Sequence, residues 1–75
     1  MKYKYTLSID GMMCGHCEAH VNNIVNKNFK VKKVKSSASK NQTVIISLEE
    51  LDEEVLRQKI NETGYLVTGL VKEEI

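Results

Sequence analysis

The sequence predicts a small α+β domain with the element order β-α-β-β-α-β. Three observations indicate this order: apolar and polar residues alternate over residues 3–9, apolar stripes of helical period follow Gly15 and Asp52, and a polar loop at 39–42 separates two strand-like segments. The 75 residues are expected to form one domain, residues 1–75. A chain of this length buries only about 60% of the surface that it exposes when unfolded, so a thin core is expected.

The first strand is predicted over residues 3–9, and Asp10 and Gly11 end it. Successive side chains of a strand point to opposite faces, so the alternation indicates a strand with one buried face. Tyr3 and Tyr5 are therefore expected in the core. The apolar face carries Tyr3, Tyr5, Leu7 and Ile9.

From about Gly15 the apolar residues follow a helical period. Val21, Ile24 and Val25 fall on one stripe of this predicted helix, and Glu18 and Asn22 lie away from it.

Two strands are predicted next, over residues 31–38 and 43–48, and the polar residues 39–42 between them indicate a hairpin loop. In the second of these strands Val44, Ile46 and Leu48 share a face.

A second helix is predicted over residues 52–63, with Asp52 as its N-cap and Gly64 as its stop. Its apolar face carries Leu51, Val55, Leu56 and Ile60. A fourth strand is expected over 65–71, with residues 72–75 frayed. These elements suit a ferredoxin-like sandwich, in which a four-stranded antiparallel sheet carries two helices on one face.

The charge balance bears on the class of partner. A formal net charge of +1 argues against nucleic-acid binding, which normally requires a strongly basic chain. The charge is segregated, which indicates either two solvated surfaces or a surface that steers a partner protein. The basic stretch is Lys27, Lys30, Lys32, Lys33 and Lys35, and the acidic stretch is Glu49, Glu50, Asp52, Glu53 and Glu54.

The cellular compartment is expected to be the cytoplasm. No stretch approaches transmembrane length, and the N-terminus has no apolar signal core. Two neighbouring cysteines cannot supply the disulfide framework of a small secreted domain, so both thiols are expected to be reduced.

Cys14 and Cys17 are the only cysteines of the chain, and they share the run of residues 11–17. Thiolate sulfur is a soft ligand that suits Cu(I) and, less selectively, Zn(II). The run leads into a helix, whose first N–H groups and dipole stabilise anions. Both thiols are therefore expected to ionise more readily than a cysteine in solution, whose pKa is about 8.5.

Three kinds of site are compatible with two cysteines at this spacing. A structural zinc site normally needs four protein ligands, and here only the local His16 and His20 could add to the cysteines. A thioredoxin-type redox motif also begins a helix, but active sites of that family are faced by a cis-proline and this chain contains no proline. A surface metal site of low coordination number remains, and it suits Cu(I).

The pattern Gly-Met-x-Cys-x-x-Cys at 11–17, placed after the first strand of a βαββαβ chain, resembles the heavy-metal-associated domain family. This family includes bacterial copper chaperones and the N-terminal modules of copper-transporting P-type ATPases. The resemblance covers residues 3–71 or so, and a separate chain of this size looks more like a chaperone than an ATPase module.

The resemblance implies a non-enzymatic metal carrier. Cys14 and Cys17 would hold Cu(I) and pass it to a metal-transporting P-type ATPase or another metal-binding protein through a shared three-sulfur intermediate. Met12 would pack into the core. A monomer is expected, with a metal-bridged dimer as the alternative at high metal load.

Met13 and Tyr65 are candidate accessory residues near the metal. The family commonly has threonine where this chain has Met13, which is either an exposed loop side chain or a thioether near the ion. The pair Gly64-Tyr65 resembles a loop of bacterial copper chaperones in which a tyrosine lies close to the site.

The two histidines raise the question of metal identity. His16 is expected to face solvent. His20 follows Cys17 by three residues, so it is either a solvated helix residue or a third ligand. A third ligand would favour Zn(II), Cd(II) or Hg(II) over Cu(I), and this is the alternative hypothesis for the metal.

Overall fold

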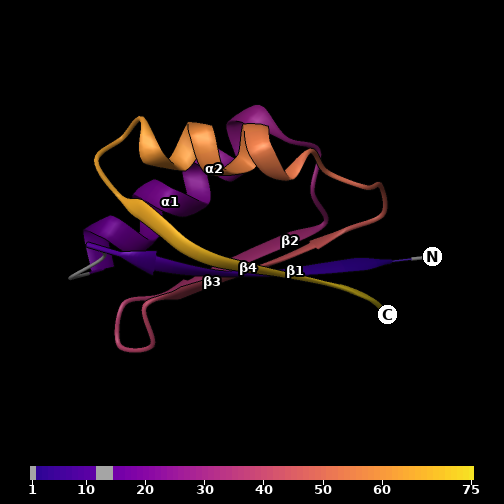
Figure 1. Ribbon diagram of the computed structural model, residues 1–75, viewed down its shortest axis with the longest axis horizontal. Coiled ribbons are helices and arrows are strands. Elements are labelled where there is room, and N and C mark those ends of the chain that lie inside the picture. Colours follow the sequence, from indigo (N-terminus) through magenta and orange to yellow (C-terminus); the bar gives the residue numbers. More distant parts are fainter. Residues whose placement is uncertain (1, 12–14) are drawn as a thin grey trace.

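A computed structural model of the protein describes residues 2–11 and 15–75. The strands form one antiparallel sheet in the order β2-β3-β1-β4, and both helices cover the same face of it (Figure 1). This arrangement confirms the predicted ferredoxin-like α+β fold. The elements are β1 (Tyr3–Asp10), α1 (Gly15–Asn28), β2 (Lys33–Ser37), β3 (Gln42–Ser47), α2 (Glu53–Asn61) and β4 (Leu66–Glu74).

The core lies between the sheet and the two helices. Tyr5 is fully buried, as predicted, and its hydroxyl accepts a hydrogen bond of 2.8 Å from the backbone N–H of Leu51, just before α2. Tyr3 is half-buried and packs against this core. Burial of each large apolar side chain contributes about 1.5–3 kcal/mol to folding. The buried cluster is Tyr5, Leu7, Ile9, Val21, Val25, Ile45, Leu56, Ile60 and Val67.

Strand β3 directs two hydroxyl side chains into this core. Thr43, Ile45 and Ser47 are fully buried. The Thr43 hydroxyl shares a 2.9 Å hydrogen bond with the hydroxyl of Ser36, and Ser47 donates one of 2.7 Å to the backbone carbonyl of Glu49. Because both hydroxyls are hydrogen-bonded, their burial carries little penalty.

Val44, Ile46 and Leu48 alternate with these residues and share the opposite, uncovered face. Val44 and Ile46 are half-buried, and Leu48 is 58% exposed. The shared face of these three residues, predicted from the sequence, is therefore the outer surface of the sheet.

Strand β4 is longer than the sequence predicts. Residues 72–75 were expected to fray, but β4 pairs with β1 along its whole length, and Ile75 donates a hydrogen bond of 2.9 Å to Lys2. The Lys72 ammonium lies 2.8 Å from the carboxylate of Glu50, and this hydrogen bond raises the pKa of Lys72 above its ordinary value. The expectation of fraying was wrong because the partner strand extends to the end of β4.

Helix α2 begins as predicted, but it ends at Asn61 with Glu62 as its C-cap, two residues before the predicted end. The carboxylate of Asp52 accepts hydrogen bonds from the backbone N–H groups of Glu54 (3.0 Å) and Val55 (3.3 Å), which makes Asp52 the N-cap. Beyond the helix Gly64 has a φ of 101°, which glycine adopts without strain. Neither helix of the described residues is long and apolar enough to cross a membrane.

The cap can be tested by substitution. We expect Asp52→Ala to lower the free energy of unfolding by about 1 kcal/mol, because two N–H groups of the first turn lose their acceptor. Asp52→Ser retains a capping oxygen and should stay close to the parent protein. Urea unfolding followed by circular dichroism measures both variants, and equal stabilities for Ala and Ser would contradict the capping role.

Candidate metal site

Cys17 lies in the first turn of α1, at the end of the molecule opposite the chain termini (Figure 1). Its side chain is half-buried and packs against the core, while the neighbouring His16 is exposed, as the sequence predicts. The backbone N–H groups of a first helical turn and the helix dipole favour an anionic group at this position. Met12, Met13 and Cys14 lie outside the described residues.

Two chain connections meet beside this turn. Gly11 follows β1 and Gly64 precedes β4, and both have a positive φ, of 96° and 101°. A Cβ atom added to Gly11 would lie 3.7 Å from Cδ1 of Tyr65 and 4.0 Å from the carbonyl oxygen of Gly64. The segment that leads into the cysteine run therefore packs directly against the segment that carries Tyr65.

Tyr65 also contacts helix α1. Its hydroxyl lies 3.4 Å from Nδ1 of His20, and the two rings meet edge to face with their centroids 5.9 Å apart and an interplanar angle of 77°. An edge-to-face arrangement is one of the favourable geometries for two aromatic rings. The structure thus brings together Gly11, Tyr65 and His20, one turn of helix beyond Cys17. His20 itself is exposed.

The other side of α1 is tied to the β2–β3 hairpin. The Glu18 carboxylate accepts a hydrogen bond of 2.6 Å from the backbone N–H of Ala38, and Asn22 accepts one of 2.7 Å from the hydroxyl of Ser36. Glu18 directly follows Cys17, so its bond fixes the turn that carries the cysteine. Sequence analysis missed this role, because the partner lies 20 residues away and no local pattern marks it.

A preformed set of metal ligands is absent from residues 2–11 and 15–75. No three His, Cys, Asp or Glu side chains gather there in a group that could hold an ion. Within that part of the chain, Cys17 is the sulfur donor at the start of α1, and the nearby His20 contacts Tyr65.

A model of the heavy-metal-associated domain family matches residues 6–65. The match spans α1, β2, β3 and α2 in full and most of β1, and it includes the cysteine run and Tyr65. No curated protein sequence is significantly similar to the chain.

Solved structures of similar fold include a metallochaperone and two domains of larger proteins. The CopZ metallochaperone is 23% identical, with a TM-score of 0.77 over 87% of this chain and 98% of that chain. The N-terminal domain of ZntA in its Zn(II)-form is 21% identical, with a TM-score of 0.78 over 96% and 93%. A copper binding domain from HMA7, a P-type ATPase, is 17% identical, with a TM-score of 0.74 over 96% and 95%. At these identities the likeness concerns the fold.

The Glu18 tether yields a testable consequence. We expect Glu18→Ala to lower the free energy of unfolding by about 1–2 kcal/mol, because the Ala38 N–H loses a charged acceptor. Glu18→Gln keeps an acceptor oxygen and should recover about half of the loss. Amide hydrogen exchange at Ala38 should accelerate in the alanine variant, and unchanged exchange there would show that the tether does not form.

Proposed function

The chain belongs to the heavy-metal-associated domain family, and we propose that it is a Cu(I) carrier that binds the ion through the thiolates of Cys14 and Cys17. The observation that carries this proposal is the position of Cys17 on the first turn of α1, where an N-terminal helix end favours a thiolate. Cys14 precedes it by three residues in the same run, so one ion can bind both sulfurs.

Copper(I) is the favoured ion because the donor set is small and soft. Two thiolates satisfy Cu(I), whereas Zn(II) normally takes four ligands in closed sites. Nδ1 of His20 already lies 3.4 Å from the Tyr65 hydroxyl. This contact favours a two-sulfur site over one in which that nitrogen is a third ligand.

Transfer to a partner would proceed by ligand exchange. A partner thiolate binds the ion first, giving a three-sulfur intermediate, and a sulfur of this chain then leaves. Cys17 is only half-buried and His16 beside it is exposed, so a second protein can approach this end of the molecule. The partner would be a metal-transporting P-type ATPase or another metal-binding protein, met in the cytoplasm. No catalysis is involved, and the carrier is a monomer unless shared ions bridge two copies.

A second candidate keeps the fold and changes the ion to Zn(II), Cd(II) or Hg(II). His20 favours this candidate, because it lies on the same helix as Cys17, one turn away. Its ring would have to leave the contact with Tyr65 to bind an ion through Nδ1. Met13 could add a thioether, and the similar domain of ZntA was solved in its Zn(II)-form.

Substitution of both cysteines tests the leading proposal. In a competition titration with a chromophoric Cu(I) chelator, Cys14→Ser/Cys17→Ser should bind Cu(I) more than about a hundredfold more weakly. Mutation of a residue that only hydrogen-bonds to a metal ligand typically lowers metal affinity by about 10–100-fold, and loss of the ligands themselves should cost more. Serine hydroxyls are hard ligands of nearly the same size, so the fold should persist. Wild-type affinity in the double variant would sink the proposal.

Substitution of His20 separates the two candidates. For a two-sulfur Cu(I) site, His20→Ala should leave the ratio of Zn(II) to Cu(I) affinity within about twofold, or ~0.4 kcal/mol, of the parent value. Under the second candidate the ratio falls, because Zn(II) loses a ligand that Cu(I) does not need. His16→Ala is the matched control, since His16 is an exposed histidine on the same helix. Tyr65→Phe removes the hydroxyl near Nδ1 of His20. Under the second candidate this variant should bind Zn(II) more tightly, because His20 no longer has to leave that contact. Under the leading proposal its Zn(II) affinity should not change.

A further inference from the structure

The outer face of the sheet is basic and partly apolar, although the helices cover only the opposite face (Figure 1). The strand register places Lys4, Ile46 and Lys33 side by side across three strands, and Lys35 beside Val44. We call this surface the lysine face. It consists of Lys4, Lys33, Lys35 and Lys40 around Val44 and Ile46.

Two hollows lie on the lysine face. A hollow of about 420 Å³ is lined by the first three lysines together with Val44, Ile46 and Ile75. A second hollow, of about 230 Å³, lies between Lys35, Lys40 and Val44, with two polar residues at its sides. The hollows share Lys35 and Val44, so they adjoin along the β2–β3 hairpin, and we refer to the two together as the groove. Neither hollow is lined by an aspartate or a glutamate.

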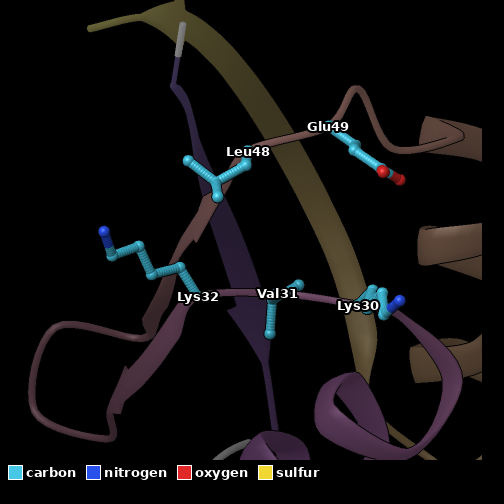
Figure 2. A pocket seen from close by; sticks show the side chains of 5 residues that line it. All are labelled: Lys30, Val31, Lys32, Leu48 and Glu49. Atoms are coloured by element: carbon cyan, nitrogen blue, oxygen red, sulfur yellow. The ribbon is translucent and has the colours of Figure 1, made fainter.

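The apolar line of the hairpin continues beyond the lysine face. At the end opposite the hairpin turn, Val31 and the exposed Leu48 line a further hollow of about 310 Å³. Figure 2 shows these two side chains on neighbouring chain segments, with those of Lys30, Lys32 and Glu49 around them. Leu48 thus continues the apolar row of Val44 and Ile46, whereas Val31 packs against the core and Glu49 adds an acidic side chain to this hollow.

Protection of a sheet edge does not account for this pattern. Lysines on edge strands prevent unwanted strand pairing, and Lys33 and Lys35 of edge strand β2 could serve that purpose. Lys4 belongs to β1, which has a strand on each side, and it still lines the groove. The neighbour of Lys4 on β4 is Glu73, so a cross-strand charge pair accounts for a lysine at that position. The observation that points to an anionic ligand is that three lysines, Lys4, Lys33 and Lys35, line one hollow.

The residues of the groove also narrow the class of that ligand. No aromatic side chain lines either hollow, so the groove lacks the stacking platform that single-stranded nucleic acids require. The two hollows of the groove are lined by no Trp, Phe or Leu, the side chains that anchor proteins in a membrane interface, and Leu48 lies outside them. A groove with an apolar floor and a basic rim instead complements an acidic segment of a protein that carries apolar side chains.

We infer that the lysine face docks an acidic, amphipathic segment of a partner protein. Apolar side chains of that segment rest on Val44 and Ile46, and its carboxylates pair with Lys4, Lys33 and Lys35. This surface is distinct from the end of the molecule that carries Cys17. The inference therefore does not depend on the identity of the metal or on metal binding at all.

The probe for this inference is a capped, fluorescein-labelled peptide of alternating glutamate and leucine, measured by fluorescence anisotropy with the full chain. Lys33→Gln/Lys35→Gln should weaken binding roughly five- to tenfold, since each exposed ion pair contributes modestly. The matched control is Lys27→Gln/Lys59→Gln, which removes the same charge from the groove between the two helices. The control should bind the peptide as the parent protein does, and both double variants should keep the parent Cu(I) affinity.

The apolar floor is tested separately. Val44→Thr/Ile46→Thr keeps β-branched side chains in the strand and should weaken binding of the glutamate–leucine peptide but not of a glutamate–serine peptide. Backbone amide shifts on peptide addition should be confined to the lysine face. The inference would be overturned if both lysine double variants weakened peptide binding equally. It would also be overturned if the amide shifts lay elsewhere on the surface, or if the peptide did not bind. Binding to vesicles of anionic phospholipid without binding to the peptide would assign the face to a membrane instead, and would equally refute it.

Discussion

The position of the first turn of α1 is the constraint on which the candidate site depends. Burial of Val21 and Val25 against the sheet holds the helix as a whole. Its first turns are fixed from two further sides, by the bond from Ala38 to Glu18 and by the contact between Tyr65 and His20. Cys17 lies between these two attachments. A thiolate on a rigid helix end needs little reorganisation when it exchanges ligands, which suits a carrier that must both bind and release an ion.

The sequence predicts the parts of the fold that follow from local patterns. Alternation identifies β1, a helical stripe identifies α1, and the cap at Asp52 marks the start of α2. The inner face of β3 could not be predicted from the sequence. Thr43 and Ser47 are polar, and they are buried because Ser36 and Glu49 form hydrogen bonds with them in the folded protein.

The candidate site shows the same division between local and long-range information. The cysteine run is visible in the sequence, and the resemblance to a known family indicates Tyr65 as a candidate residue near the site. The tether between Glu18 and Ala38 was not visible, because only the folded sheet brings the hairpin turn to the helix. The end of β4 is likewise set by its pairing with β1 and by the Lys72–Glu50 ion pair. Both are long-range interactions, so no local sequence pattern predicts them.

Two surfaces with different chemistry emerge from this small domain. One end of the sandwich presents a soft thiol beside an aromatic–histidine pair, and the outer face of the sheet presents lysines around apolar residues. A partner that used both surfaces would gain affinity from the second without altering the metal chemistry at the first.

X-ray absorption spectroscopy of the protein loaded with one equivalent of Cu(I) tests the central claim most directly. The account predicts a copper ion bound by two sulfur atoms and no nitrogen, and a spectrum that requires an imidazole nitrogen would contradict it.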